Sequence, residues 1–213
     1  MNKYAIIAAS VILGSGYPSQ ADIVFSNLGA GDSFSNSGRL LQGETFGTIG
    51  NVDQASTFTV GAFSYYLTSL ELGLQVNSAG PLDVILAADT GGSPGAALET
   101  ISLNLNANGL AFASASGSTM LNANTTYWVI ADARGSYDGG WEFNNTGDLG
   151  LTAGRSAPVN SFAYGPWNLR PNDDRYALRV EGRVGPEPGS SVLLLVGFGL
   201  AGLLGHRKPE SVA

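Results

Sequence analysis

Residues 65–76 read YYLTSLELGLQV and show the clearest alternation of apolar and polar side chains in the chain. One face of this stretch is apolar and consists of Leu70, Leu72, Leu74 and Val76. The opposite face consists of Leu67, Ser69, Glu71, Gly73 and Gln75. Successive side chains of a β-strand point to opposite sides, so a period of two predicts a strand with one side on a core and the other in water.

Other short segments of β-forming residues surround this strand and are separated by turn residues. They cover residues 22–26, 43–49, 56–60, 82–88, 98–105, 110–115, 125–131, 141–143, 162–164 and 175–183. The run TTYWVIA at 125–131 has the strongest β-propensity and is predicted to be a central strand. Residues 27–39 are rich in Gly, Ser and Asn and predict a loop. Strands at roughly ten-residue spacing, with no competing helical period, predict an all-β, jelly-roll-like antiparallel β-sandwich over residues 22–183.

The composition limits the kinds of protein that this chain can be. The 213 residues include 30 glycines and no cysteine, so the domain must be stabilised by core burial and backbone pairing without disulfides. The formal net charge is −7 at pH 7. Because binding to a phosphate backbone needs a basic surface, this acidic balance argues against nucleic acid as a partner.

The N-terminal residues are typical of an export signal. Lys3 supplies a positive charge, residues 5–13 form an apolar run, and Ser19-Gln20-Ala21 fits a small-x-small cleavage site. This predicts a signal peptide at residues 1–21 and a mature chain that begins at Asp22. The alternative is a buried N-terminal strand.

The C-terminal residues 184–213 predict a membrane-directed tail. Pro186-Glu187-Pro188 precedes an apolar run at 192–204, which Arg207 and Lys208 follow. We expect a short hydrophobic helix at about residues 190–205, and about 17 residues at ~1.5 Å each give a marginal span of roughly 25 Å. The basic pair would leave the preceding domain outside the cytoplasm. The alternative is a terminal strand or helix that completes a globular core.

The Pro-Glu-Pro triplet, the Gly-rich apolar run and the terminal basic pair together resemble the PEP-CTERM sorting signal of bacteria. Its matching residues are Pro186, Glu187, Pro188, Arg207 and Lys208. The resemblance implies export across the inner membrane, transient membrane insertion through the tail, and recognition by an exosortase. It also implies a bacterium that produces exopolysaccharide.

Four stretches of the domain resemble the extracellular family called choice-of-anchor R. They read QASTFTV at 54–60, LTSLELGL at 67–74, DVILAADTGGSPG at 83–95 and TTYWVIADA at 125–133. The resemblance covers most of residues 43–182. It implies a surface domain that occurs with different anchoring tails, and it offers no catalytic residues.

The residue types exclude several catalytic arrangements. The sole histidine, His206, lies in the tail and there is no cysteine, so Ser-His-Asp, Cys-His and His-metal sites are absent from the domain. A carboxylate pair for glycoside hydrolysis would have to use two of the acids Glu71, Glu99, Glu142 and Asp138. Isolated acids on a sheet are usually only solvated, so we expect no enzyme activity and no cofactor.

Acidic residues in Gly-rich loops offer a weaker hypothesis of calcium binding, because hard cations prefer carboxylate and carbonyl oxygens. The candidates are Asp138, Asp173 and Asp174. No EF-hand spacing is present, and the alternative is that these residues only form Asx turns and keep the loops soluble.

Four aromatic residues cluster in loop-rich sequence and suggest carbohydrate binding. They are Tyr137, Trp141, Tyr164 and Trp167. Aromatic faces stack on sugar rings, while nearby asparagines could bond hydroxyl groups. The asparagines are Asn144, Asn145, Asn168 and Asn172. The alternative is that Trp141 and Tyr164 are core residues under long loops.

The sequence therefore predicts an exported surface or extracellular-matrix protein, sorted by an exosortase-type system, with a structural or adhesive role. A non-catalytic carbohydrate-binding module is the alternative, and an enzyme acting on polysaccharide is a third hypothesis. The expected partners are the exosortase, the membrane through the C-terminal tail, and exopolysaccharide.

Overall fold

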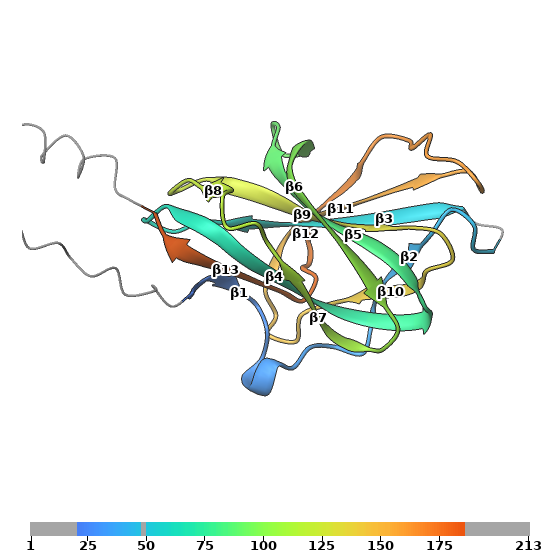
Figure 1. The fold of residues 1–213 in the computed structure, drawn as a ribbon, viewed down its shortest axis with the longest axis horizontal. Helices are drawn as coiled ribbons and strands as arrows, with labels where there is room; N and C mark the ends of the chain where they lie inside the picture. Colours follow the sequence, from blue (N-terminus) through green and yellow to red (C-terminus); the bar gives the residue numbers. More distant parts are fainter. Residues whose placement is uncertain (1–20, 48–49, 186–213) are drawn as a thin grey trace, which may run out of the picture.

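The computed structural model describes residues 21–47 and 50–185, which fold into one large antiparallel sheet that curls on itself (Figure 1). This part of the chain is nearly all β and contains no α-helix. The predicted all-β, antiparallel class is confirmed.

Thirteen strands make up the sheet. In spatial order its main path is β1 (Asp22–Ser26), β13 (Leu178–Val184), β4 (Tyr65–Ser78), β10 (Asp138–Glu142), β2 (Gly38–Gln42), β3 (Asn51–Thr59), β9 (Thr126–Ala133), β5 (Gly80–Asp89) and β6 (Pro94–Leu105). Four strands lie off this path: β7 (Gly109–Ser114) and β8 (Met120–Leu121) pair with β4, β11 (Leu149–Ala157) pairs with β3, and β12 (Asn168–Asp174) pairs with β11. A 3-10 turn, η1 (Ala30–Asp32), follows β1.

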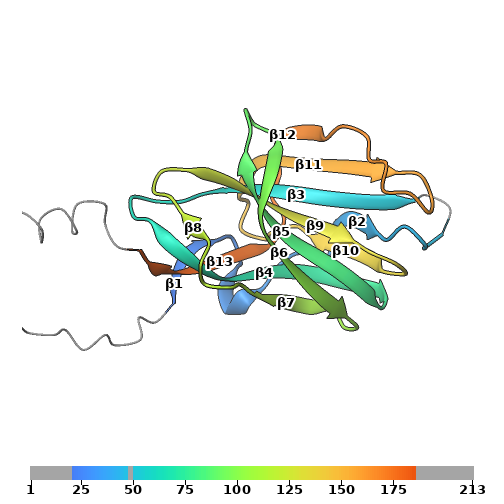
Figure 2. The same ribbon diagram turned by 45° about the horizontal axis from the view of Figure 1, so that its top comes forward.

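The curl of the sheet produces two layers around one apolar core. In Figure 2, β11 and β3 lie above β4 and β7. Leucines of β4 pack in the same cluster as Phe58 of β3, Val84 of β5 and Val129 of β9. The layers of the predicted sandwich are therefore joined by hydrogen bonds through β10 and β2.

Strand β4 is the longest strand and uses both of its edges. One edge pairs with β13 and then with β10, and the other pairs with β8 and then with β7. Leu70, Leu72 and Leu74 are buried in the core as predicted, while Gln75 is exposed. The alternation at 65–76 therefore identified the strand that contacts the most neighbours.

The first part of β4 departs from the predicted alternation. Leu67 and Ser69 were expected to face water, but both are buried. Leu67 pairs with Gly182 and Ser69 with Glu181, so Thr68 is an extra residue that forms a β-bulge. The bulge shifts the phase by one residue, which places Leu67 in the core together with Leu70.

Strand β9 is central, as its β-propensity predicted. It pairs with β3 on one side and with β5 on the other. Tyr127 and Val129 point into the main core, while Trp128 and Ile130 lie in a second small apolar cluster on the outer face. A strand buried on both faces needs apolar side chains at successive positions, which explains the unbroken run TYWVIA.

Several segment boundaries were predicted wrongly. A strand was expected at 43–49, but the strand in this region, β2, lies earlier, at 38–42, and a turn follows it. Residues 162–164 form no strand. Strands β11 and β12 were not predicted, because β11 is rich in Gly and Ala and β12 is polar and contains Pro171. Neither strand shows a period of two.

The first and last strands are antiparallel neighbours, with Asp22 opposite Gly182. The predicted signal peptide at 1–21 lies outside the described residues except for Ala21, and so does the predicted hydrophobic helix at about 190–205. Within residues 21–47 and 50–185, no helix is long and apolar enough to cross a membrane.

Replacing Leu72 by alanine is expected to lower the free energy of unfolding by about 2 to 5 kcal/mol, because it leaves a cavity in the core. Phe112→Ala is the matched control, since Phe112 lies opposite Glu71 on β7 but is 57% exposed. The control should change stability by less than about 1 kcal/mol. Urea denaturation would measure both, and equal losses would contradict the assigned core face.

Candidate functional site

Two of the four predicted glycan-binding aromatics belong to the core. Tyr137 and Trp141 are both 0% exposed. The Trp141 Nε1–H donates to the Ala177 carbonyl at 2.9 Å, and its ring stacks on Tyr176 with 4.8 Å between centroids. The Tyr137 hydroxyl donates to the Gln75 carbonyl at 3.1 Å. This corrects the predicted cluster, because neither ring has a free face for a sugar.

The other two aromatics lie in the segment 158–167, which connects β11 to β12. The Arg155 guanidinium lies 3.9 Å from the centre of the Tyr164 ring and 4.4 Å from that of Trp167. These cation–π contacts fix the segment against the outer face of the sheet. The structure therefore does not bring the four predicted aromatics together.

Beneath this segment, three aspartates lie side by side on neighbouring strands, and we call Asp53, Asp132 and Asp83 the aspartate row. Asp132 of β9 pairs directly with Asp83 of β5, and Asp53 of β3 pairs with Arg155 of β11. Asp53 is 0% and Asp132 3% exposed. The Tyr164 hydroxyl lies 3.0 Å from the Asp132 carboxylate and 3.3 Å from that of Asp53.

Two arginines compensate the negative charge of the aspartate row. Arg155 bonds Asp53 at 2.8 Å. Arg134 bonds both Asp132, at 2.6 Å, and Asp83, at 3.1 Å. Unpaired carboxylates this deeply buried would be strongly unfavourable, so the arginines and the Tyr164 hydroxyl are needed to keep the row inside the fold.

Burial and the neighbouring Asp132 raise the pKa of Asp53 from its ordinary 3.8 to about 7, against the lowering effect of Arg155. Burial also raises the pKa of Asp132, although Arg134 opposes it. Burial and both carboxylates raise the pKa of Tyr164, so its hydroxyl stays protonated and can donate. Tyr164 therefore bridges two buried carboxyls whose pKa values are both raised.

Two of the three predicted calcium candidates are used in other contacts. Asp138 accepts hydrogen bonds from the amides of Gln42 and Asn77. Asp173 bonds Arg39 at 3.1 Å and Arg170 at 3.3 Å, and the adjacent Asp174 is exposed. In the described part of the chain, no group of three or more His, Cys, Asp or Glu side chains could hold a metal ion.

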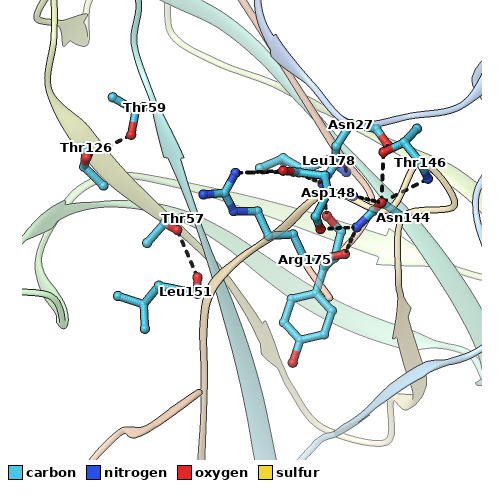
Figure 3. A network of polar contacts seen from close by, with 11 residues as sticks. Asn27, Thr57, Thr59, Thr126, Asn144, Thr146, Asp148, Leu151, Arg175 and Leu178 are labelled. Carbon is cyan, nitrogen blue, oxygen red and sulfur yellow. Dashed lines mark hydrogen bonds and ion pairs between the residues drawn. The ribbon is translucent and has the colours of Figure 1, made fainter. Parts of the chain in front are cut away.

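Asn144, a predicted partner for sugar hydroxyls, instead organises a turn (Figure 3). Its Nδ2 donates to the carbonyls of Asp148 and Arg175, both at 2.8 Å, and its Oδ1 accepts from the backbone N–H of Thr146 and of Asp148. Asn27 acts in a similar way on the neighbouring strand, where its Oδ1 accepts from the Leu178 N–H at 2.8 Å. Both side-chain amides therefore form hydrogen bonds with the backbone.

Of the acids considered for catalysis, Glu142 has the most unusual surroundings. Glu71 is paired with Arg179 at 2.9 Å, and Glu99 accepts from the Ser116 N–H. Glu142 ends β10, is 3% exposed, and its Oε2 has no hydrogen-bond partner among the described residues. Burial raises the pKa of Glu142.

Glu142 lines a groove of about 390 Å³. Its wall also includes Phe34, Asn36, Leu74, Gln75 and Asn108. These residues come from the loop before β2, from β4 and from the β6–β7 turn. Among the described residues that line the groove, Glu142 alone carries a carboxyl group, whereas glycoside hydrolysis uses two.

Local contacts fix the walls of this groove. The Ser35 N–H donates to the Phe143 carbonyl at 3.0 Å, which ties the 34–36 segment to the end of β10. Gly73 lies under Phe34, and a Cβ at Gly73 would come within 2.9 Å of the Phe34 ring. The Asn108 Oδ1 accepts from the Val76 N–H at 2.7 Å, which fixes the opposite wall.

Residues 186–208 match the family model of the PEP-CTERM protein-sorting motif. The match includes all five predicted sorting residues, which lie outside the described residues: Pro186, Glu187, Pro188, Arg207 and Lys208. The motif implies that the chain is exported and sorted by an exosortase. A search of curated proteins found no match.

The buried carboxyl pair predicts a particular pH dependence of stability. Because the folded-state pKa of Asp53 lies above 3.8, its contribution is complete below about pH 4 and is lost as the pH rises through about 7. Asp53→Asn should remove this part, so the stability difference between wild type and variant should change by about 2 kcal/mol between pH 5 and pH 8.

Urea denaturation at the two pH values would measure this difference. Asp174→Asn, the same carboxyl-to-amide change on the exposed end of β12, serves as the control for the substitution itself. Parallel pH profiles for wild type and Asp53→Asn would contradict the raised pKa.

Proposed function

We propose that the β domain is a non-catalytic module displayed at the cell surface or in the extracellular matrix of an exopolysaccharide-producing bacterium, with a structural or adhesive role. The observation that carries this proposal is the position of the sorting motif. Strand β13 ends at Val184 and the motif begins at residue 186, so Gly185 alone separates the folded domain from the motif.

The end of the domain is firmly held up to this point. Val184 pairs with Tyr65 of β4, and the Gly185 N–H donates to the Ser64 carbonyl at 2.8 Å. The described chain begins at the neighbouring strand β1, where Asp22 lies opposite Gly182, so its two ends lie side by side. A domain retained through residues 186–208 would therefore present its remaining strands and loops away from the attachment point.

Three features support a non-catalytic role. The domain contains no cysteine or histidine for nucleophilic catalysis. Asp53 and Asp132, two carboxyls whose pKa burial raises, are enclosed beneath Tyr164. The groove beside Glu142 is lined by neutral amides and by the aromatic ring of Phe34, which suits binding.

Mass spectrometry of the protein from its native envelope tests the proposed export and processing. We expect the mature chain to begin at Asp22 and to end before the apolar run at residue 192. Replacing Pro186, Glu187 and Pro188 by alanine should leave an unprocessed precursor, because the sorting triplet is gone.

Pro209→Ala is the matched control, since residue 209 lies just outside the matched motif. This variant should be processed like the wild type. A mature chain that retains residues 192–204 would contradict processing and would indicate a permanent anchor instead. A chain that stays in the cytoplasm would overturn the proposed surface role.

A further inference from the structure

We propose that the groove beside Glu142 binds a neutral sugar ring through adjacent hydroxyl groups. The inference rests on the proposed function in one respect: the domain must be displayed at the cell surface or in the matrix, where it encounters the sugar. It gives the adhesive role a binding site that differs from the aromatic cluster expected from the sequence.

The main argument is the unsatisfied carboxyl of Glu142. Buried polar atoms in folded proteins almost always have a hydrogen-bond partner, and a buried acceptor without one costs about 1 to 3 kcal/mol. The backbone of Glu142 is held in place, because it pairs with Gly38 and its carbonyl accepts from the Ala177 N–H at 2.8 Å. A ligand that donates hydrogen bonds would satisfy the carboxyl without moving the backbone.

The amides around Glu142 complement hydroxyl groups, which both donate and accept. Asn108 uses its Oδ1 to accept from the Val76 N–H, and Gln75 uses its Nε2 to donate to Asn77. Each amide thus retains one further polar atom for a ligand, a donor on Asn108 and an acceptor on Gln75. Together with the Glu142 acceptor they provide the mixed set that neighbouring sugar hydroxyls require.

The apolar part of the groove fits the carbon face of a sugar. Phe34 is half-buried against Gly73 and provides the apolar surface of the groove. Aromatic rings commonly provide the flat surface on which ring C–H groups pack. A volume of about 390 Å³ lies at the lower end of the range for small-molecule pockets, which suits one or two sugar rings.

The charge of the groove favours neutral sugars over charged ones as the ligand. None of the residues that line it is basic, and Glu142 supplies a single negative charge. Sugars that carry a carboxylate, sulfate or phosphate would therefore find no cationic partner and would be repelled.

Binding can be tested on the full-length chain in detergent by isothermal titration calorimetry. The probes are D-glucose, D-galactose, D-mannose and their β-1,4-linked disaccharides, with D-glucuronic acid as the anionic comparison. We expect at least one neutral sugar to bind with millimolar or better affinity and glucuronic acid to bind at least tenfold more weakly.

Glu142→Gln keeps the shape of the side chain and removes its charge, so affinity should fall at least tenfold. Asn36→Ala changes an exposed residue at the rim and should weaken binding without affecting the fold. Glu181→Gln is the matched control, since Glu181 bonds Ser69 and does not line the groove, and it should bind like the wild type. Circular dichroism would confirm that each variant is folded.

The proposal would be overturned if none of these neutral sugars binds, or if Glu142→Gln and Asn36→Ala both bind as tightly as the wild type. Binding of ethanolamine without binding of any sugar would also overturn it, because the carboxyl would then recognise a cation. None of these results affects the processing of the termini, so a failed binding site is distinguishable from a failed surface role.

Discussion

The whole sheet depends on the double pairing of β4. Within its 14 residues this strand makes backbone ladders with β13 and β10 on one edge and with β8 and β7 on the other. Its four buried leucines, at positions 67, 70, 72 and 74, close the core against the opposite layer. Because the chain has no cysteine, no covalent link can replace these contacts. The bulge at Thr68 is compatible with this role, since it turns Leu67 toward the same core that Leu70 occupies.

Sequence patterns revealed the strands whose two faces differ or whose β-propensity is unusually high. Strands β4 and β9 belong to these groups. The patterns failed where packing, not polarity, decides the position of a residue. Trp141 follows Gly139 and Gly140 in a segment that resembles a loop, yet these glycines allow β10 to lie between two strands. A Cβ at Gly139 would come within 2.0 Å of the Gln75 carbonyl oxygen. A Gly-Gly-Trp run is thus a signal of tight packing as well as of a turn.

The two polar regions could not be assembled from the sequence, because each depends on register. Asp53, Asp83 and Asp132 are separated by up to 79 positions and meet because their strands are aligned in one row. Likewise, Glu142 was among the acids considered from the sequence, but Phe34 and Asn108 reach it only through the curl of the sheet. Asp132 on the outer face of β9 suggests from the sequence that this face is exposed to solvent. The segment 158–167, which covers this face, has no strand pattern that would reveal the cover.

The place of β13 has a mechanical consequence. This strand lies between β1 and β4 and leads through Gly185 to the sorting motif. Tension applied to the domain through Gly185 is therefore transmitted first to β13. A pull along the strand strains the hydrogen bonds to β1 and to β4 at the same time, whereas a pull across it breaks them one after another. The same domain should thus resist shear much better than peeling.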